Sequence, residues 1–393
     1  MASQTPAHVV AMQGPDPAQS SRVWTPIVDQ HATWIAVNPI QGCPKACTYC
    51  FLNERGQTAV RPRHLTSSEA TADLLVNSSF YAASRPVALY TWTDVMALPA
   101  SRAHLAELLE NLVARQLLNP IVLITKCRVP DETVELIDSV RRRGLTVLVY
   151  VSYSGLGPDI ERGIRHEEVA ENFPRLADRN IPIVHYWRPS FPSSADESTM
   201  QRVLEHAARY ARCTVAVGLK VEPAALTRLS QLWPELATTP AATEAEGVYP
   251  RTFWRFIHRT WRYRPGYPVF HTNSCALAFV LGRPDSFGVF GSEVCRMRNV
   301  CPVGQRYRCT AADAERRAPT DTEVRDVLAR RGLTEVPYSF DADGRELILD
   351  AAVETNLVAA LTHDLGIPVR AQRHHEDAYW SSGTAGAVPV IIE

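Results

Sequence analysis

The sequence predicts an α/β protein whose main body is a partial (β/α)6 barrel. Six short apolar runs rich in β-branched or aromatic residues lie between residues 34 and 221. Amphipathic helical stretches separate most of these runs, and buried strands that alternate with helices are typical of a parallel sheet. Six such units in this length of chain favour a partial barrel over an open two-layer sheet.

The elements of the barrel follow one another in a regular order. Residues 1–33 carry scattered Pro, Ser and Gln without periodicity and are expected to form a partly ordered N-terminal extension. The barrel itself is predicted to occupy residues 34–225. The predicted strands are residues 34–40, 86–92, 120–125, 145–152, 181–187 and 213–221, and the clearest predicted helices are residues 101–117, 131–144 and 195–211.

The rest of the chain is predicted to form two further regions. Residues 226–250 read as a short helix and a Pro/Thr/Ala loop, which places a boundary there. Residues 226–310 then form a linker and a cysteine-rich region, and residues 311–393 a small acidic α/β domain. Its predicted elements are a helix at 321–331, a strand at 346–350, a helix at 352–365 and strands at 367–373 and 388–392.

The amino-acid composition restricts the classes of protein to which this chain can belong. The chain has 46% hydrophobic residues, 21% charged residues and a formal net charge of -1, which predicts a globular protein without a general attraction to nucleic acid or membrane. It has no apolar run of about 18 residues, and its first 30 residues lack the pattern of a secretory signal. Nine cysteines, three of them closely spaced, favour cytosolic thiols and metal ligands over a disulfide framework, so we expect a cytoplasmic protein.

Three cysteines stand together in the segment NPIQGCPKACTYCF at 38–51: Cys43, Cys47 and Cys50. A zinc site usually has four ligands, often in two pairs, and this segment has no fourth Cys or His. An iron–sulfur cluster held by three thiolates keeps one iron open to an outside ligand. The segment also follows the first predicted strand, where barrel enzymes place their chemistry. A zinc knuckle or a chance group of thiols is the alternative.

The spacing Cys-x3-Cys-x2-Cys, with Tyr49 before the last cysteine, resembles the radical S-adenosylmethionine superfamily, whose partial barrel is of the TIM type. The resemblance implies a [4Fe–4S] cluster whose open iron is chelated by the amine and carboxylate of S-adenosylmethionine. It also implies one-electron cleavage of this cofactor to a 5'-deoxyadenosyl radical, which abstracts a substrate hydrogen. The electron would come from a reducing partner such as flavodoxin or ferredoxin.

Further motifs between residues 34 and 220 resemble the spore photoproduct lyase branch: Thr93–Asp94, ITK at 124–126, Ser152 and Glu161. The resemblance implies a cofactor-binding set of seven residues. In it Asp94 contacts the methionine amine, Ser152 the ribose and Arg188 the carboxylate, while Gly218 leaves room beside the adenine; Tyr49, Thr93 and Glu161 complete the set. The alternatives are a capping aspartate, a turn serine, a surface glutamate, a structural arginine and a packing glycine.

One departure from the lyase concerns hydrogen return. The lyase has a cysteine shortly before its Ser/Thr–Asp pair, whereas this chain has Thr91. An alcohol O–H bond is much stronger than a thiol S–H bond, which argues against thymine-dimer repair by the same route. Cys127, directly after ITK, is a candidate hydrogen donor, with plain packing as its alternative. Cys213 is expected in the core.

A second set of cysteines, Cys275, Cys295, Cys301 and Cys309, lies within 35 residues. Its wide spacing favours an auxiliary [4Fe–4S] cluster over a zinc ribbon. Structural zinc stays open, as does a cluster on three cysteines with the fourth free. Residues 251–310 carry ten Arg and two acidic residues, and the arginines between the cysteines would offset the cluster's charge.

Two more segments carry candidate binding residues. The basic, aromatic stretch at 251–266 suits phosphate contacts and base stacking, or else docks by its aromatic side and leaves its arginines in solvent. The segment HHEDAYW at 374–380 has the residue types of a metal site but is better explained as a surface turn.

The sequence therefore predicts a radical S-adenosylmethionine enzyme that acts on a small or nucleotide-like, phosphorylated substrate. Oxidation, epimerisation, rearrangement and C–C bond formation all stay open as the net reaction. A nucleic-acid repair or modification enzyme and a non-enzymatic iron–sulfur sensor are the alternatives.

Overall fold

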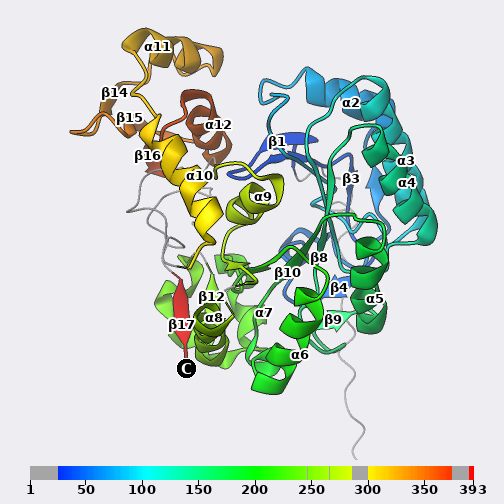
Figure 1. Ribbon diagram of the computed structural model, residues 1–393. Helices are drawn as coiled ribbons and strands as arrows, with labels where there is room; N and C mark the ends of the chain where they lie inside the picture. Colours follow the sequence, from blue (N-terminus) through cyan, green and yellow to red (C-terminus); the bar gives the residue numbers. More distant parts are fainter. Residues whose placement is uncertain (1–24, 246, 265, 286–299, 374–388) are drawn as a thin grey trace, which may run out of the picture.

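The structure is a computed structural model, shown in Figure 1. It describes residues 25–245, 247–264, 266–285, 300–373 and 389–393. No helix in these described ranges combines the length and the apolar character needed to span a membrane.

The centre of the fold is one eight-stranded sheet with the order β1-β2-β6-β7-β8-β10-β11-β13. β1 (Val28–Gln30) pairs antiparallel with β2 (Ile35–Val37), and every other pair in the sheet is parallel. β1 and β13 form its two edges. The other strands are β6 (Val87–Leu89), β7 (Ile121–Thr125), β8 (Val147–Val151), β10 (Ile183–Trp187), β11 (Cys213–Ala216) and β13 (Val269–Phe270).

All six predicted strands are confirmed, and the sheet is mostly parallel as expected. The sequence analysis missed β1 and β13, which extend the sheet at its two edges. Both are very short, and β13 has only two residues, so neither produces an apolar run long enough to recognise.

Helices cover both faces of the sheet, which explains why its strands read as continuous apolar runs. On one face, alternate strand residues such as Val87 and Leu123 share a core with helix residues such as Leu109 and Phe173. On the other face, Ala88 and Tyr150 pack with α9 (Asn273–Leu281), which lies opposite the outer helices in Figure 1. The outer helices are α2 (Ser68–Val76), α3 (Pro99–Ala114), α4 (Asp131–Arg142), α5 (His166–Ala177) and α6 (Glu197–Ala208).

Short elements connect the sheet with the rest of the chain. They include the strand pairs β3 (Ile40–Gln41) with β5 (Arg63–His64) and β4 (Ala46–Cys47) with β9 (Glu161–Arg162). After β11 come α7 (Leu226–Ser230), β12 (Val248–Pro250), α8 (Arg251–Tyr263) and, beyond α9, α10 (Val303–Ala314). Short 3-10 helices lie at Asn53–Arg55, Pro192–Ser194, Pro223–Ala225, Pro234–Thr238 and Pro240–Thr243.

The C-terminal part has its own small sheet, ordered β14-β15-β16. β15 (Leu347–Val353) pairs antiparallel with β14 (Tyr338–Phe340) and parallel with β16 (Val369–Arg373). α11 (Asp321–Arg330) and α12 (Thr355–Leu365) bury this sheet's apolar residues in a separate core. The predicted helices and the strands at 346–350 and 367–373 are confirmed. The strand predicted at 388–392 is present as β17 (Val390–Ile392), but it pairs with β12 instead of this sheet.

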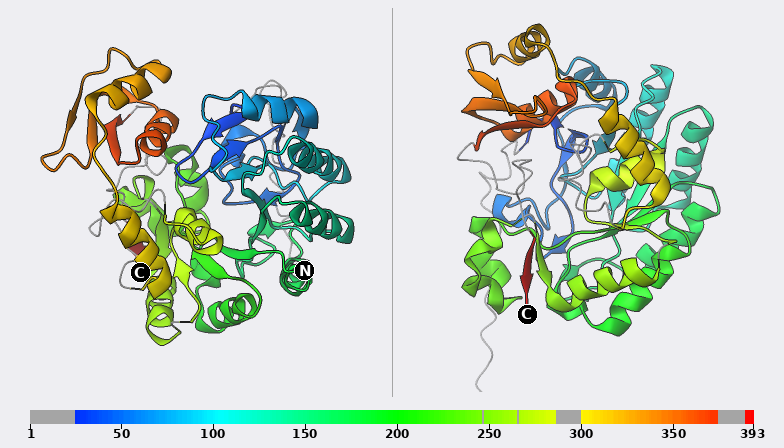
Figure 2. Two further views of the ribbon diagram at one scale, coloured as in Figure 1. Left: turned by 45° about the horizontal axis from the view of Figure 1, so that its top comes forward. Right: turned by 60° about the vertical axis from the view of Figure 1, so that its left-hand side comes forward.

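An ion cluster attaches this C-terminal part to the segment between α2 and β6 of the main body, and Figure 2 shows the two parts side by side. Asp364 of α12 contacts Arg85 at 2.6 Å and Arg331 at 2.6 Å. Arg331 also donates a hydrogen bond to the carbonyl of Ser79 at 2.7 Å. The two arginine side chains are only 9% and 6% exposed, so this contact is largely excluded from solvent.

Candidate functional site

The loop that carries the first three cysteines is fixed by backbone contacts. Gly42 has a φ of 90°, and a Cβ there would lie 3.0 Å from Val60, so both the backbone conformation and the packing favour glycine. The amide of Asn53 donates hydrogen bonds to the carbonyls of Cys47 at 3.0 Å and Cys50 at 2.7 Å. The cysteines are thus presented by an ordered loop at the end of β2 and β3.

The three thiols are mostly buried and lie close enough to affect one another. Burial raises the pKa of Cys43 and of Cys47 to about 12, and it also raises the pKa of Cys50. Repulsion from the neighbouring Cys50 contributes to the raised pKa of both Cys43 and Cys47. The thiols therefore stay protonated at neutral pH in the absence of a metal. A metal ion binds the deprotonated thiolate, so its binding would release these protons.

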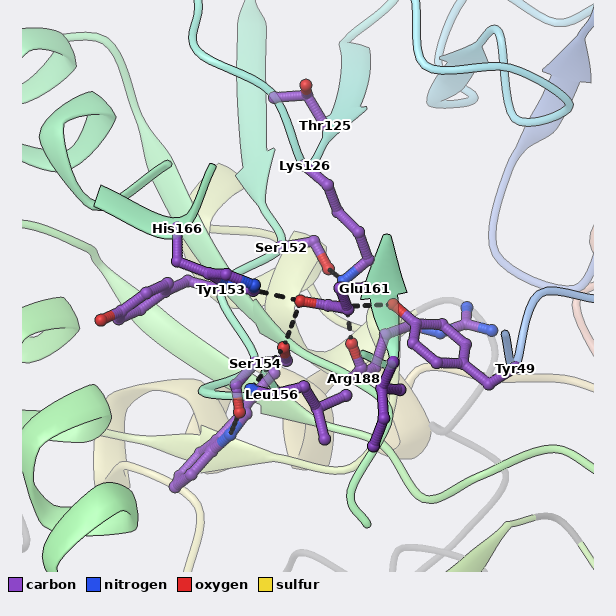
Figure 3. Close-up of polar contacts among 12 residues, drawn as sticks. Tyr49, Thr125, Lys126, Ser152, Tyr153, Ser154, Leu156, Glu161, His166 and Arg188 are labelled. Carbon is purple, nitrogen blue, oxygen red and sulfur yellow. Dashed lines mark hydrogen bonds and ion pairs between the residues drawn. The ribbon is translucent and has the colours of Figure 1, made fainter. Parts of the chain in front are cut away.

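Glu161 is the centre of a buried polar network beside these thiols (Figure 3). Its carboxylate is fully buried and accepts hydrogen bonds from the hydroxyls of Tyr49 and Ser154, the latter at 2.7 Å. The ammonium of Lys126 lies 2.7 Å away, and the imidazole of His166 lies 3.6 Å away. Burial and the negative charge of Glu161 raise the pKa of Tyr49 well above its usual value, so Tyr49 stays a proton donor to Glu161.

Lys126 connects three neighbouring strands at their C-terminal ends. Besides Glu161, its ammonium donates to the hydroxyl of Ser152 at 2.7 Å and to the carbonyl of Arg188 at 3.2 Å. These contacts use all three donors of the ammonium group. Lys126 was not among the predicted site residues, although it belongs to the ITK motif at 124–126; Ser154 and His166 had no sequence signal.

Asp94 also lies at this edge, after β6, and the protein holds both of its carboxylate oxygens. One accepts from the hydroxyl of Thr125 at 2.8 Å and the backbone N–H of Met96 at 3.1 Å. The other accepts from the backbone N–H of Lys126 at 2.7 Å. The orientation of the carboxylate is therefore fixed by its neighbours.

Two polar groups near Asp94 are buried without a hydrogen-bond partner. They are the hydroxyl of Thr93 and the side-chain amide nitrogen of Asn38, which follows β2. The other end of the Asn38 amide accepts from the hydroxyl of Thr91 at 3.0 Å. Buried polar groups normally have partners, so these two mark a place where a ligand can complete the bonding.

Arg188 follows β10 and has no ion pair with an acidic side chain among the residues that the structure describes. One guanidinium nitrogen donates to the hydroxyl of Tyr186 at 2.8 Å, and the group lies 5.3 Å from the centre of the Tyr186 ring. A partly buried guanidinium with unused donors is suited to bind a carboxylate.

Gly218 and Cys127, the remaining predicted site residues of the barrel, lie in different surroundings. A Cβ on Gly218 would come within 2.7 Å of the carbonyl of Val248, so close packing against β12 favours glycine at this position. Cys127 lines a cavity beside Asp94, and burial together with the charge of Asp94 raises the pKa of its thiol. Cys213 is buried in β11 as expected.

The second cysteine set is described in part, because Cys295 lies outside the described residues. The thiol of Cys275 contacts the carboxylate of Asp285 at 3.4 Å, and the backbone N–H of Asp285 contacts the sulfur of Cys309 at 3.4 Å. Asp285 is only 4% exposed and contacts both of these partly buried cysteines. Cys301 packs against the same apolar cluster as Cys275. The sequence analysis missed Asp285.

Across the described part of the chain, no three Cys, His, Asp or Glu side chains are grouped to ligate one metal ion. The segment at 374–380, which the sequence suggested is a surface turn, lies outside the described residues. The basic helix α8 buries Phe253, Phe256 and Ile257, and its exposed arginines include Arg259, which pairs with Glu197 at 2.8 Å. It therefore docks by its apolar side, the alternative that the sequence left open.

Comparison with solved structures finds similar chains at low sequence identity. A spore photoproduct lyase complexed with a dinucleoside spore photoproduct is 15% identical, with a TM-score of 0.44, over 60% of this chain and 75% of the lyase. SuiB of Streptococcus suis bound to S-adenosylmethionine is 12% identical, with a TM-score of 0.37, over 52% of this chain and 47% of SuiB. A radical SAM methyltransferase from Sphaerobacter thermophilus is 12% identical, with a TM-score of 0.37, over 52% of this chain and 64% of the methyltransferase. No family model matches the chain, and no curated protein matches it.

Proposed function

We propose that this chain is a radical S-adenosylmethionine enzyme. The observation that carries the proposal is the ordered loop with three neighbouring, mostly buried thiols, set beside Asp94, Lys126 and Glu161 at the C-terminal edge of a parallel sheet. The open order of the sheet, with crossover helices on its outer face, supports a partial barrel.

The three cysteines fit a [4Fe–4S] cluster in the number and chemistry of their donors. Each thiolate binds a different iron of such a cluster, so the ligands need not converge on one point as they do around a zinc ion. The positive charge of Lys126 lowers the pKa of Cys47, and those of Arg188 and Arg228 lower the pKa of Cys50, against the stronger effect of burial. These cations offset the negative charge that the thiolates bring.

The neighbouring polar groups fit S-adenosylmethionine. Arg188 offers donors to a carboxylate, and Asp94 offers oxygens to an amine. The unpartnered groups of Thr93 and Asn38 provide two more hydrogen-bonding positions. We assign Ser152 to a hydrogen bond with the ribose. Tyr49 and Glu161 form part of the wall of this pocket. Gly218 stays a candidate for the position beside the adenine.

When bound, cluster and cofactor together supply reductive C–S cleavage and hydrogen-atom abstraction. The chain's own residues orient the cofactor and keep the site polar but enclosed. Thr125 and the backbone at 96 and 126 fix the orientation of the Asp94 carboxylate, so it would be ready to bind the amine of the cofactor. Lys126 and Glu161 balance each other's charge and hold three strand ends together.

The test is anaerobic reconstitution followed by assay with dithionite and S-adenosylmethionine. We expect about four irons per chain at the first cluster, together with formation of 5'-deoxyadenosine. Cys47→Ala should abolish this product, whereas Cys213→Ala, which removes a buried thiol far from the loop, should retain it. Zinc in the cysteine loop, or iron without 5'-deoxyadenosine, would reject the enzyme and favour a structural site or a sensor.

We further propose an auxiliary [4Fe–4S] cluster on Cys275, Cys295, Cys301 and Cys309. The shared contact of Cys275 and Cys309 with Asp285 supports it, and a cluster on three of these cysteines is the alternative. Cys301→Ala should lower the iron content by up to about four per chain and leave cleavage of S-adenosylmethionine at least partly intact. An iron content that is unchanged in both Cys301→Ala and Cys275→Ala would contradict the second cluster.

We propose a small, nucleotide-like or phosphorylated substrate and a flavodoxin or ferredoxin as the reductant. Repair or modification of nucleic acid is the second candidate. It predicts binding to DNA or RNA that weakens steeply with added salt, because phosphate contacts release counterions. A salt-independent interaction, or none, favours the small substrate.

A further inference from the structure

A cavity of about 470 Å³ opens beside the candidate cofactor site. Its walls come from the segments after β6, β7 and β8 and from the cysteine loop. Basic side chains dominate the charged part of this lining, with Glu168 as the acidic member. The basic members are Lys45, Arg102, Lys126, Arg128 and Arg165.

Three outer helices begin at this cavity. Their first residues are Pro99 in α3, Asp131 in α4 and His166 in α5, each close in sequence to a lining residue. None of these three helices has a side-chain hydrogen bond at its N-cap. Helix N-termini present backbone N–H groups and partial positive charge, which adds to the charge of the basic side chains.

Three of the basic side chains, Arg102, Arg128 and Lys45, have partners that a ligand can replace. Arg102 lies 3.7 Å from Glu132, whose side chain is 70% exposed, and Arg128 lies 3.3 Å from Asp131, whose side chain is 73% exposed. Lys45 donates to the carbonyl of Gly163 at 2.7 Å. Ion pairs to such exposed acids contribute little, so exchanging them for a bound anion costs little.

We propose that this cavity binds the phosphate or carboxylate group of a small anionic ligand. Its volume lies in the usual range of small-molecule sites, about 300–1,000 Å³, which favours a small ligand over a flat protein surface. That the ligand is the substrate rests on the proposed function. In that role its anionic group lies beside the thiol of Cys127 and next to Lys126, which reaches from the cavity to Glu161.

The location differs from the one that the sequence suggested. The basic helix at 251–263 packs by its apolar side and leaves its arginines exposed, whereas the cavity collects its cations from four separate segments. A small anion is recognised by positive charges that converge from several elements on one concave site.

The test is calorimetric titration of the reconstituted protein with inorganic pyrophosphate. The variant carries Arg102→Gln and Arg128→Gln, which remove two cations from the cavity. Affinity should fall about tenfold for each arginine, because each loses a charge-assisted hydrogen bond to the anion. The control carries Arg142→Gln and Arg143→Gln, at the far end of α4, and should bind as the wild type does. Circular dichroism should show that both variants are folded.

Two results would overturn the proposal: no wild-type binding tighter than about 1 mM, or equal affinity in the cavity variant and the control. A cavity variant that keeps its pyrophosphate affinity but is reduced more slowly by flavodoxin would replace the ligand site with a docking surface for an acidic protein. Failure of the proposed function looks different, because pyrophosphate would still bind while wild-type protein formed no 5'-deoxyadenosine.

Discussion

Replacing Glu161 with glutamine tests whether the buried network beside the cysteine loop depends on its negative charge. The Glu161 side chain is 1% exposed and that of Lys126 is 17% exposed, so the ammonium would lose its counter-charge in a largely enclosed site. The amide also presents an N–H group to partners that are themselves donors, the hydroxyls of Tyr49 and Ser154. Breaking one partner out of a buried ion pair costs about 3–5 kcal/mol.

We therefore expect Glu161→Gln to lower the free energy of unfolding of the metal-free protein by about 3–5 kcal/mol. The measurement is urea unfolding followed by tryptophan fluorescence. Glu171→Gln, an exposed change on α5, is the matched control and should stay within about 0.5 kcal/mol of the wild type.

A double variant separates the charge from the shape of the side chain. Adding Lys126→Met removes the unpaired cation, so the double variant should be less destabilised than the sum of the two single changes. Additive losses, or a loss below about 1 kcal/mol for Glu161→Gln alone, would refute a charge pair at the centre of this network.

Three further changes test other parts of the structure. Asp364→Asn leaves Arg85 and Arg331 without their shared counter-charge, so the C-terminal domain should be cleaved faster by protease and unfolding free energy should fall by about 3–5 kcal/mol. Gly218→Ala forces a Cβ against the carbonyl at 248 and should cost about 1–3 kcal/mol in thermal unfolding, whereas Gly157→Ala, with open space around it, should be neutral. Burial lowers the pKa of His363 to about 4, so the unfolded chain binds this proton first and stability should fall as pH drops from about 6.5 to about 4. His363→Gln should make that loss shallower by about one proton; an unchanged slope would contradict the assignment.

The strands of the main sheet could be predicted because both of their faces are buried. A strand such as β8 then becomes an unbroken apolar run that sequence periodicity detects. β13 has only two residues and is defined by its pairing with β11, so no local sequence pattern predicts it. The predicted strand at 388–392 shows the same limit, since its residues are apolar but its pairing with β12 depends on the whole fold.

The residues of the candidate site also divide into those that the sequence could predict and those that it could not. Close spacing in sequence identified Cys43, Cys47 and Cys50, because one loop holds all three. Ser154 and His166 meet Glu161 only through the folding of the segment around β9, and neither has a distinctive sequence context. Asp285 likewise belongs to no sequence motif, and only the structure shows that it contacts the sulfurs of two cysteines.

The network around Glu161 explains how so many polar groups can be buried at one edge of the sheet. Its acid has a cation and several donors, and that cation has three acceptors, so the charges are compensated before any ligand binds. Arg188, Thr93 and Asn38 keep unused bonding capacity at the same edge. A site that needed all these groups for stability would leave none for recognition. The satisfied groups therefore keep the pocket in one arrangement, and the unsatisfied groups at the same edge offer further bonding positions to a ligand.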